Sequence, residues 1–311
     1  MNFLHKINYM KSAKAWITMS IVLTLLGVGA IFARGFNKGI DFTGGLFYDI
    51  RFDQAITSAQ ITDAAKKSLN AEVVVQKAEV KGTANGTAIE YFLRTPELKE
   101  DQQLKLKADL KQLGNYTIIS EDQVSGSVST ELRDQAILAI LIAAVLQILY
   151  LSVRFQFKFG VTAVVALLHD VIITAGAVAL FGIQINSPFV AAILTILGYS
   201  INDTVIVFDR IRENLARRKK GEDLEALTTR SMQEVITRSI YTVLTVLFTL
   251  ACMLVWGGDS IWDFALTLFI GITSGMYSSI FIAAALWLYW QKWEDANRRA
   301  AAIKKIKPAK A

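Results

Sequence analysis

The sequence predicts an α-helical membrane protein with six transmembrane helices and a ferredoxin-like α+β domain between the first helix and the second. Three observations lead to this prediction. Hydrophobic residues make up 53% of the 311 positions and charged residues only 19%. The apolar residues gather in long windows without charge, whereas the stretch between the first two windows is polar. Lysine and arginine are concentrated in every second segment that connects the windows.

The charge-free windows have the length, roughly 20 residues, that a helix needs to cross hydrocarbon. They cover residues 15–33, 135–153, 171–202, 239–258 and 264–291. The third window is too long for one helix, and Gly182, Asn186 and Pro188 supply turn residues inside it. We therefore expect one helix over about 159–182 and another over about 188–208.

The distribution of basic residues predicts the orientation of the helices, because cytoplasmic connections are enriched in lysine and arginine. Basic residues lie in the N-terminal tail, the 154–158 turn, the 209–238 loop and the C-terminal tail, and none lie in 183–188 or 257–263. We expect both termini in the cytoplasm of a bacterial cell, in its inner membrane. The expected parts are a tail with the first helix (1–33), a periplasmic domain (34–135), five further helices (136–291) and a basic tail (292–311). The net charge of +6 then reflects orientation and does not indicate nucleic-acid binding.

The polar stretch after the first helix has the element order of a ferredoxin-like fold, β-α-β-β-α-β. The pattern predicts strands over 46–52, 72–80, 88–94 and 116–120, a helix over 57–70, and a helix opened by Pro96 and ended by Gly114. Thr57 and Gln60 have the spacing of a capping box. Asn85 and Gly86 form a favoured hairpin turn.

This predicted domain lacks the residues that most metal and nucleotide sites need. It contains no histidine, no cysteine and no GxxxxGK loop, so we expect no metal and no cofactor and interpret it as a contact module. The sole cysteine of the chain, Cys252, lies in a transmembrane window, so an intrachain disulfide is excluded.

The segment GIDFTGG (39–45) opens the domain, and its glycines permit sharp backbone turns close to the membrane. The residues of interest are Gly39, Asp41, Gly44 and Gly45. On physical grounds the simplest interpretation is a flexible junction, and a functional junction motif is the alternative.

Asp203 is the most unusual charge in the chain. It lies in GYSINDTVIVFDR after 32 residues without charge. An ionised side chain inside the bilayer costs on the order of 3 kcal/mol, so such residues usually mark an ion or proton path. Counting from Arg210 at 1.5 Å per residue places Asp203 roughly 10 Å deep. Asn202 beside it does not neutralise the charge, so we interpret Asp203 as functional and Asp209 as an interfacial ion-pair partner.

Two further ionisable residues, His169 and Asp170, interrupt the preceding helix. Asp170 is expected roughly 15 Å deep, comparable to Asp203 on the next helix. Adjacent helical residues point about 100° apart, so His169 and Asp170 are not expected to face one partner. A structural hydrogen bond between helices and a proton relay both remain open.

Arg238 begins a polar line along the fifth helix, followed by Thr242, Thr245 and Thr249 on one face. This line could hold water beside a carboxylate. Alternatively, the threonines bond their own helix and Arg238 reaches the headgroups. Small residues at 271, 275, 278 and 279 predict close helix packing in the last helix, not chemistry.

Taken together, these motifs resemble the SecF branch of the SecD/SecF family, a half-size relative of the proton-driven resistance-nodulation-division exporters. The resemblance rests on GIDFTGG after the first helix, ALLHDVIIT in the third, GYSINDTVIVFDRIREN closing the fourth, and the glycine pair at 257–258. It covers nearly the whole chain.

The resemblance implies a function in protein translocation and no enzymatic activity. With SecD, the proton motive force would promote late steps of preprotein translocation through SecYEG across the inner membrane. The implied partners are SecD, SecYEG, YajC, the translocating preprotein and membrane lipids, with no nucleic acid. The family's aspartate falls on Asp203 and its arginine on Arg238, whereas another essential aspartate belongs to SecD.

Three other functions are compatible with parts of the sequence. A proton-coupled exporter of small molecules or lipids would share the intramembrane carboxylates, but a domain of about 100 residues is small for a substrate cavity. An intramembrane aspartyl protease would use Asp170 and Asp203 as a pair, yet the GxGD pattern of such enzymes is absent. The third alternative is a scaffold without proton coupling.

Overall fold

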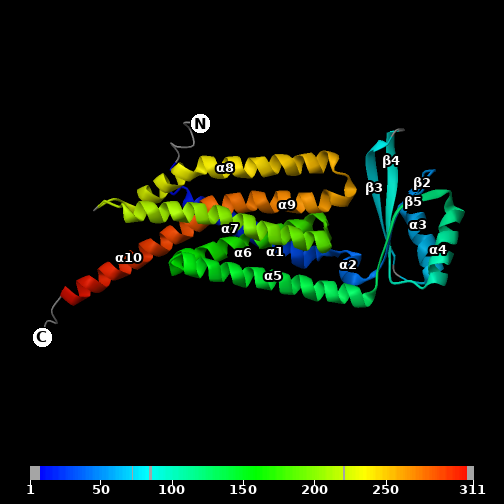
Figure 1. The fold of residues 1–311 in the computed structure, drawn as a ribbon, viewed down its shortest axis with the longest axis horizontal. Helices are drawn as coiled ribbons and strands as arrows, with labels where there is room; N and C mark the ends of the chain where they lie inside the picture. The colour runs from blue at the N-terminus through cyan, green and yellow to red at the C-terminus, as the bar shows by residue number, and fades with distance from the viewer. Residues whose placement is uncertain (1–7, 72, 84–85, 220, 307–311) are drawn as a thin grey trace. The chain divides into compact units, whose positions relative to one another are not determined.

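The computed structural model describes residues 8–306 apart from positions 72, 84, 85 and 220. The chain divides into two compact units, of which one contains the long helices and the other the β-sheet (Figure 1). The helical unit comprises residues 1–36, 140–183 and 188–311, and the sheet unit comprises 37–139 together with 184–187. A short stretch between two transmembrane helices thus belongs to the sheet unit, which the sequence pattern does not predict.

Six helices among the described residues are long and apolar enough to cross a membrane, as predicted. They are α1 (Ala13–Arg34), α5 (Gly126–Arg154), α6 (Phe157–Phe181), α7 (Ser187–Ala216), α8 (Leu224–Trp256) and a last helix built from α9 (Asp259–Tyr277), η2 (Ser278–Ala283) and α10 (Ala284–Ile306). Helix α5 begins nine residues before the charge-free window, because a polar helical extension precedes its apolar part. The η2 segment is a π-helix, an irregularity that is frequent at functional sites.

Close packing of aromatic and small residues holds the helical unit together. Helices α7, α8 and α9 run side by side in Figure 1. The rings of Phe159 and Trp287 stack with centroids 4.9 Å apart, and both side chains are almost fully buried. Gly27 of α1 and Gly176 of α6 lie against each other, since a Cβ added to Gly176 would meet Gly27 Cα at 2.2 Å. Small residues at such a crossing let two helix backbones approach closely.

The sheet unit has the predicted ferredoxin-like topology. Its elements are β2 (Gly45–Phe52), α3 (Ser58–Leu69), β3 (Val74–Thr83), β4 (Gly86–Thr95), α4 (Glu100–Leu113) and β5 (Tyr116–Val124). The strands form an antiparallel sheet in the order β3-β4-β2-β5. Alternate residues of the central strand β2 are buried, with Leu46 and Ile50 fully enclosed, and they pack with the apolar residues of α3 and α4 in one core.

Local signals account for most of the boundaries in this unit. The predicted capping box is present, since the amide of Gln60 donates to Thr57 Oγ1 at 3.3 Å and the amide of Thr57 donates to Gln60 Oε1 at 2.9 Å. The predicted hairpin is also present, with Thr83 paired to Gly86, although Asn85 lies outside the described residues. The prediction that Pro96 opens α4 is wrong by four residues, because the helix begins at Glu100.

Candidate functional site

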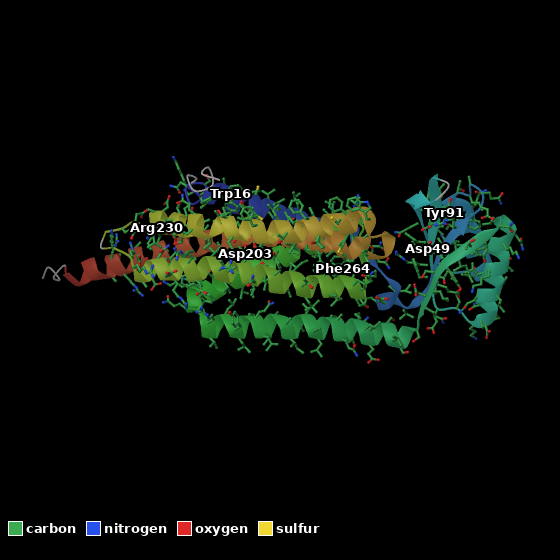
Figure 2. All side chains as sticks on the ribbon, turned by 45° about the horizontal axis from the view of Figure 1, so that its top comes forward. Trp16, Asp49, Tyr91, Asp203, Arg230 and Phe264 are labelled. Carbon is green, nitrogen blue, oxygen red and sulfur yellow. The ribbon has the colours of Figure 1, made fainter. Side chains whose placement is uncertain are left out.

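Asp203 lies on α7 in the middle of the helical bundle, whereas Arg230 lies near one end (Figure 2). The aspartate is only 3% exposed. Ser239 of α8 donates a hydrogen bond to its Oδ1 at 2.7 Å. The other carboxylate oxygen, Oδ2, is buried and has no hydrogen-bond partner in the described part of the chain. Because buried polar atoms are usually satisfied, an orphaned carboxylate oxygen points to a proton, a water molecule or a donor from another chain.

Asn202 and Arg238, which the sequence places near Asp203, are exposed and do not share its buried position. Asn202 is exposed, so it does not share the buried site. Arg238 is exposed as well, and among the ion pairs of the described residues none joins it to Asp203, although its charge still acts on the carboxylate through space. Asp209 pairs with Arg154 at 3.1 Å and with Arg212 at 2.9 Å, as expected for an interfacial charge.

The three threonines that follow Arg238 bond their own helix. Thr242 donates to the carbonyl of Arg238 at 3.0 Å, Thr245 to that of Thr242 at 2.7 Å, and Thr249 to that of Thr245 at 3.1 Å. For the threonines, this is the second of the two arrangements expected for the polar line. The hydroxyl groups still keep one face of α8 polar.

Asp170 forms a second polar centre, which the sequence predicts only in part. It is fully buried on α6. Its Oδ2 accepts hydrogen bonds from Ser200 of α7 at 2.6 Å and from Ser278 of η2 at 2.7 Å. Its Oδ1 accepts one from Ser274 of α9 at 2.9 Å. Ser278 belongs to the line of small residues that we expected to serve packing, so that part of the prediction was incomplete.

His169 is also buried, and it bonds to its own neighbour instead of to a distant partner. Its Nδ1 lies 3.0 Å from Asp170 Oδ1, a contact between the two neighbours that the sequence pattern did not predict. Since Asp170 offers only acceptors as a carboxylate, Nδ1 is the protonated nitrogen in this arrangement. The other nitrogen, Nε2, is buried without a hydrogen-bond partner in the described part of the chain.

Asp203 and Asp170 have different hydrogen-bond partners. Asp203 bonds to Ser239 and Asp170 bonds to the other serines, and no hydrogen bond joins the two carboxylates among the described residues. Two carboxylates that activate one water molecule must share it, so this arrangement does not favour the protease alternative. Within the described chain there is also no group of three or more histidine, cysteine or acidic residues that could hold a metal ion.

The junction GIDFTGG is folded rather than loose. It contains the short helix α2 (Ile40–Thr43). The two residues before the junction form β1 (Asn37–Lys38), which pairs in parallel with β6 (Gln184–Ile185). A Cβ on Gly45 would approach the carbonyl oxygen of Thr95 to 2.1 Å, and Gly45 has a φ of 121°, so only glycine fits. The flexible interpretation is therefore replaced by an ordered junction.

Asp41 makes the most informative contact of this junction. Its Oδ2 accepts a hydrogen bond at 2.7 Å from the amide of Ser187, the first residue of α7. A carboxylate at a helix N-terminus satisfies an otherwise unpaired amide and complements the helix dipole. Arg94 of β4 adds hydrogen bonds to Asn37 at 2.9 Å and to Gln184 at 2.7 Å. The junction therefore holds the beginning of the helix that carries Asp203.

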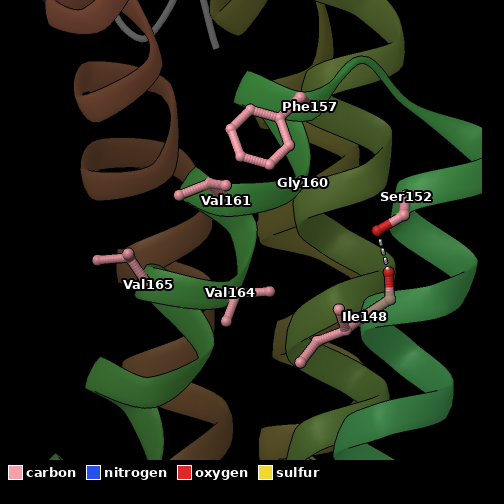
Figure 3. Close-up of a pocket in the computed structure, with 7 residues that line it drawn as sticks. All are labelled: Ile148, Ser152, Phe157, Gly160, Val161, Val164 and Val165. Atoms are coloured by element: carbon pink, nitrogen blue, oxygen red, sulfur yellow. Dashed lines mark hydrogen bonds between the residues drawn. The ribbon is translucent and has the colours of Figure 1, made fainter.

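An apolar cavity of about 320 Å³ lies between α5 and α6, away from these polar centres (Figure 3). It is lined by Ile148, Ser152, Phe157, Gly160, Val161, Val164 and Val165. The one hydroxyl group in this lining, that of Ser152, donates to the carbonyl of Ile148 at 2.7 Å. The cavity has no ionisable lining residue and therefore offers no proton-transfer chemistry.

Comparison with known proteins identifies close relatives. Residues 105–293 match the family "Protein export membrane protein SecD/SecF, C-terminal", and residues 29–56 match the "SecD/SecF GG Motif". The chain is 36% identical to protein translocase subunit SecF of Sebaldella termitidis, over 89% of each chain. It is 37% identical to the SecF subunit of Petrotoga mobilis, over 94% of this chain and 99% of that protein.

Solved structures are similar too. The crystal structure of SecDF from Thermus thermophilus, described as a translocon-associated membrane protein, matches with a TM-score of 0.82 and 33% identity. The match covers 92% of this chain but only 39% of the SecDF chain. A SecDF structure described as the super-membrane-facing form matches with a TM-score of 0.68.

Proposed function

The chain belongs to the SecD/SecF family of protein-export membrane proteins and functions in protein translocation, and we propose that it couples the proton motive force to late steps of that process. Relatives that match over most of their length are named as SecF subunits of a protein translocase. This family membership does not favour the exporter alternative.

The observation that carries the proposal is the unpartnered, buried oxygen of Asp203 in the middle of a transmembrane helix. We assign proton binding to this carboxylate. Arg238 is the nearby positive charge that would compete with a proton, and Asn202 lies on the exposed side of the same turn. Protonation removes the attraction to Arg238 and changes which helix packing is preferred.

A SecD-type chain is the proposed partner, because relatives such as SecDF of Thermus thermophilus carry a region similar to this chain within a longer protein. The exposed polar face of α8 is the proposed side of contact, where a second acid from the partner would complete the site. We further propose SecYEG, YajC and the translocating preprotein as partners. The proposed location is the bacterial inner membrane, with both termini in the cytoplasm and residues 34–135 in the periplasm.

A vesicle experiment tests this function. Inverted inner-membrane vesicles with and without the chain receive a preprotein that is stalled midway by exhausting ATP, and a proton motive force is then restored. We expect the stalled preprotein to finish crossing only in vesicles that contain the chain and its SecD-type partner, and a protonophore should stop it. Equal completion without the chain would refute the motor function. Completion that needs the chain but ignores the protonophore would support the scaffold alternative.

A second prediction concerns the contact by which movement of α7 would reach the sheet-containing domain. Replacing Asp41 with alanine removes the acceptor for the Ser187 amide at the start of α7. Capping contacts of this kind are worth about 1 kcal/mol, so the protein should still fold while α7 loses its attachment to the junction. We expect proton-driven translocation to fall about fivefold, the factor that corresponds to about 1 kcal/mol. Hydrogen exchange should rise at the first amides of α7.

A matched control for this variant is Asp53→Ala, which removes an exposed carboxylate just after β2 in the same domain. We expect it to behave as wild type in both measurements. An Asp41→Ala protein with faster exchange at the start of α7 but full translocation would show that this contact does not transmit movement.

A further inference from the structure

The two buried acids of the bundle differ in how many donors surround them. Within the described part of the chain, Asp203 receives one side-chain hydrogen bond, and its Oδ2 has no partner. Asp170 receives four, from His169 and three serines, and is 0% exposed. A carboxylate whose two oxygens are both occupied twice has little capacity left for an exchanging proton. We infer that Asp170 is a positioning residue, which holds α7 so that the free oxygen of Asp203 faces the proton path.

The donors around Asp170 come from separate helices, so the carboxylate ties these helices to one another. Ser200 comes from α7, whereas Ser274 and Ser278 come from the last transmembrane helix. Hydrogen bonds to a charged group are about twice as strong as neutral ones. The cluster formed by Asp170, His169, Ser200, Ser274 and Ser278 is named the Asp170 hub below.

The last helix is shaped to fit this hub. Its π-helical segment begins at Ser278, and a π turn accommodates one residue more than an α turn. The consecutive residues Ser278 and Ser279 both bond to other helices: Ser278 to Asp170, and Ser279 to the hydroxyl of Thr204 at 2.7 Å. Gly275 lies directly against Ser200, where an added Cβ would come within 3.1 Å of the Ser200 Cβ. Backbone irregularity and small residues thus both bring the last helix onto α7.

Hydrogen bonds to neighbouring helices lie on both sides of Asp203 along α7. Ser200 precedes Asp203 by three residues, or about one helical turn, and bonds to Asp170. Thr204 follows Asp203 directly and bonds to Ser279. Because rotation of α7 would break both attachments, they fix the direction in which the Asp203 side chain points.

The inference rests on the proposed proton binding by Asp203, and infrared spectroscopy can separate the two claims. The full chain is reconstituted with its SecD-type partner, and the carboxylic acid C=O band is followed as pH is varied. The titratable and charged groups near the two acids are His169 from α6, Tyr199 from α7, Arg238 from α8 and Tyr277 from α9. Three variants are compared with wild type: Asp203→Asn, Asp170→Asn, and Ser200→Ala combined with Ser278→Ala.

We expect Asp203→Asn to remove a titrating carboxyl band, which tests the proposed function. Asp170→Asn and the double serine variant should keep that band but move its midpoint by about one pH unit, because the surroundings of Asp203 change. Proton-driven translocation should fall about tenfold in both variants, because a shift of one pH unit in the midpoint changes the proton affinity of the carboxylate tenfold. A purely structural role in folding would lower the amount of protein but would not move the midpoint.

Thr273→Ala is the matched control, because it removes a hydroxyl next to Ser274 that faces outward and bonds only its own helix. It should leave both the midpoint and translocation unchanged. Loss of the titrating band in Asp170→Asn would overturn the inference, because Asp170 would then carry the proton itself. An unshifted band in the double serine variant would overturn it as well, even if Asp170→Asn fails to fold.

Discussion

Replacing Asp203 with asparagine is expected to reduce proton-driven translocation to the level of vesicles that lack the chain. Asparagine has nearly the same shape and keeps an oxygen that can accept the hydrogen bond from Ser239. The fold should therefore be retained. Unlike a carboxylate, however, the amide is neutral and does not bind and release a proton. The expected loss is at least about 100-fold, the size typical of removing a proton-transfer group. The measurement is completion of a stalled preprotein under a proton motive force.

Asp209→Asn is the control for this experiment, because it removes a carboxylate from the same helix at the interface, where Asp209 pairs with Arg154 and Arg212. Surface ion pairs contribute about 0–1 kcal/mol, so we expect translocation close to wild type. An Asp203→Asn protein that still completes translocation at the wild-type rate would exclude this carboxylate as the proton carrier.

The fold could be predicted because its physical signals are local. A helix that crosses hydrocarbon needs an uninterrupted apolar window, and each of the six helices contains one or part of one. Turn residues and the capping box at Thr57 specified the order of elements in the domain. Two helix boundaries were predicted wrongly. Helix α5 begins earlier than its apolar part, because polar residues extend it, and α4 begins a short connection after Pro96 and not at that residue.

The candidate site could be predicted only for residues that are unusual in their surroundings. A single aspartate in an apolar helix is rare, so Asp203 and Asp170 were both found. Ser200, Ser239 and Ser278 were missed, because serine is common in transmembrane helices and its partner depends on how distant helices pack. The line of small residues in the last helix was the available signal, and it was interpreted as packing alone.

The attachment of the junction to the loop between α6 and α7 had no sequence signal. The strands β1 and β6 have two residues each, too few for any alternation of polar and apolar side chains. Asp41 was singled out only as part of a glycine-rich motif. Its capping of α7 becomes visible when residues about 150 positions apart are brought together, as Asp41 and Ser187 are here.

Replacing Gly176 with alanine is expected to force α1 away from α6. An added Cβ would lie 2.2 Å from Gly27 Cα, and the obstacle is backbone, which cannot rotate aside as a side chain would. Overpacking of this kind typically costs about 1–3 kcal/mol, so we expect a clearly lower thermal unfolding midpoint in detergent. The displacement should also disturb the hydrogen bond from Arg34 of α1 to the carbonyl of Leu180 in α6, at 2.5 Å.

Gly29→Ala provides the comparison, because Gly29 lies on α1 two residues beyond Gly27 and an added Cβ would meet no atom within 4 Å. Alanine favours a helix more than glycine does, so Gly29→Ala should leave stability unchanged or raise it by up to about 1 kcal/mol. In Gly176→Ala the displacement of α1 should also lower translocation, because the chain runs from α1 directly into β1 and the junction. Equal unfolding midpoints for the two variants would show that the contact between Gly27 and Gly176 does not hold these helices together.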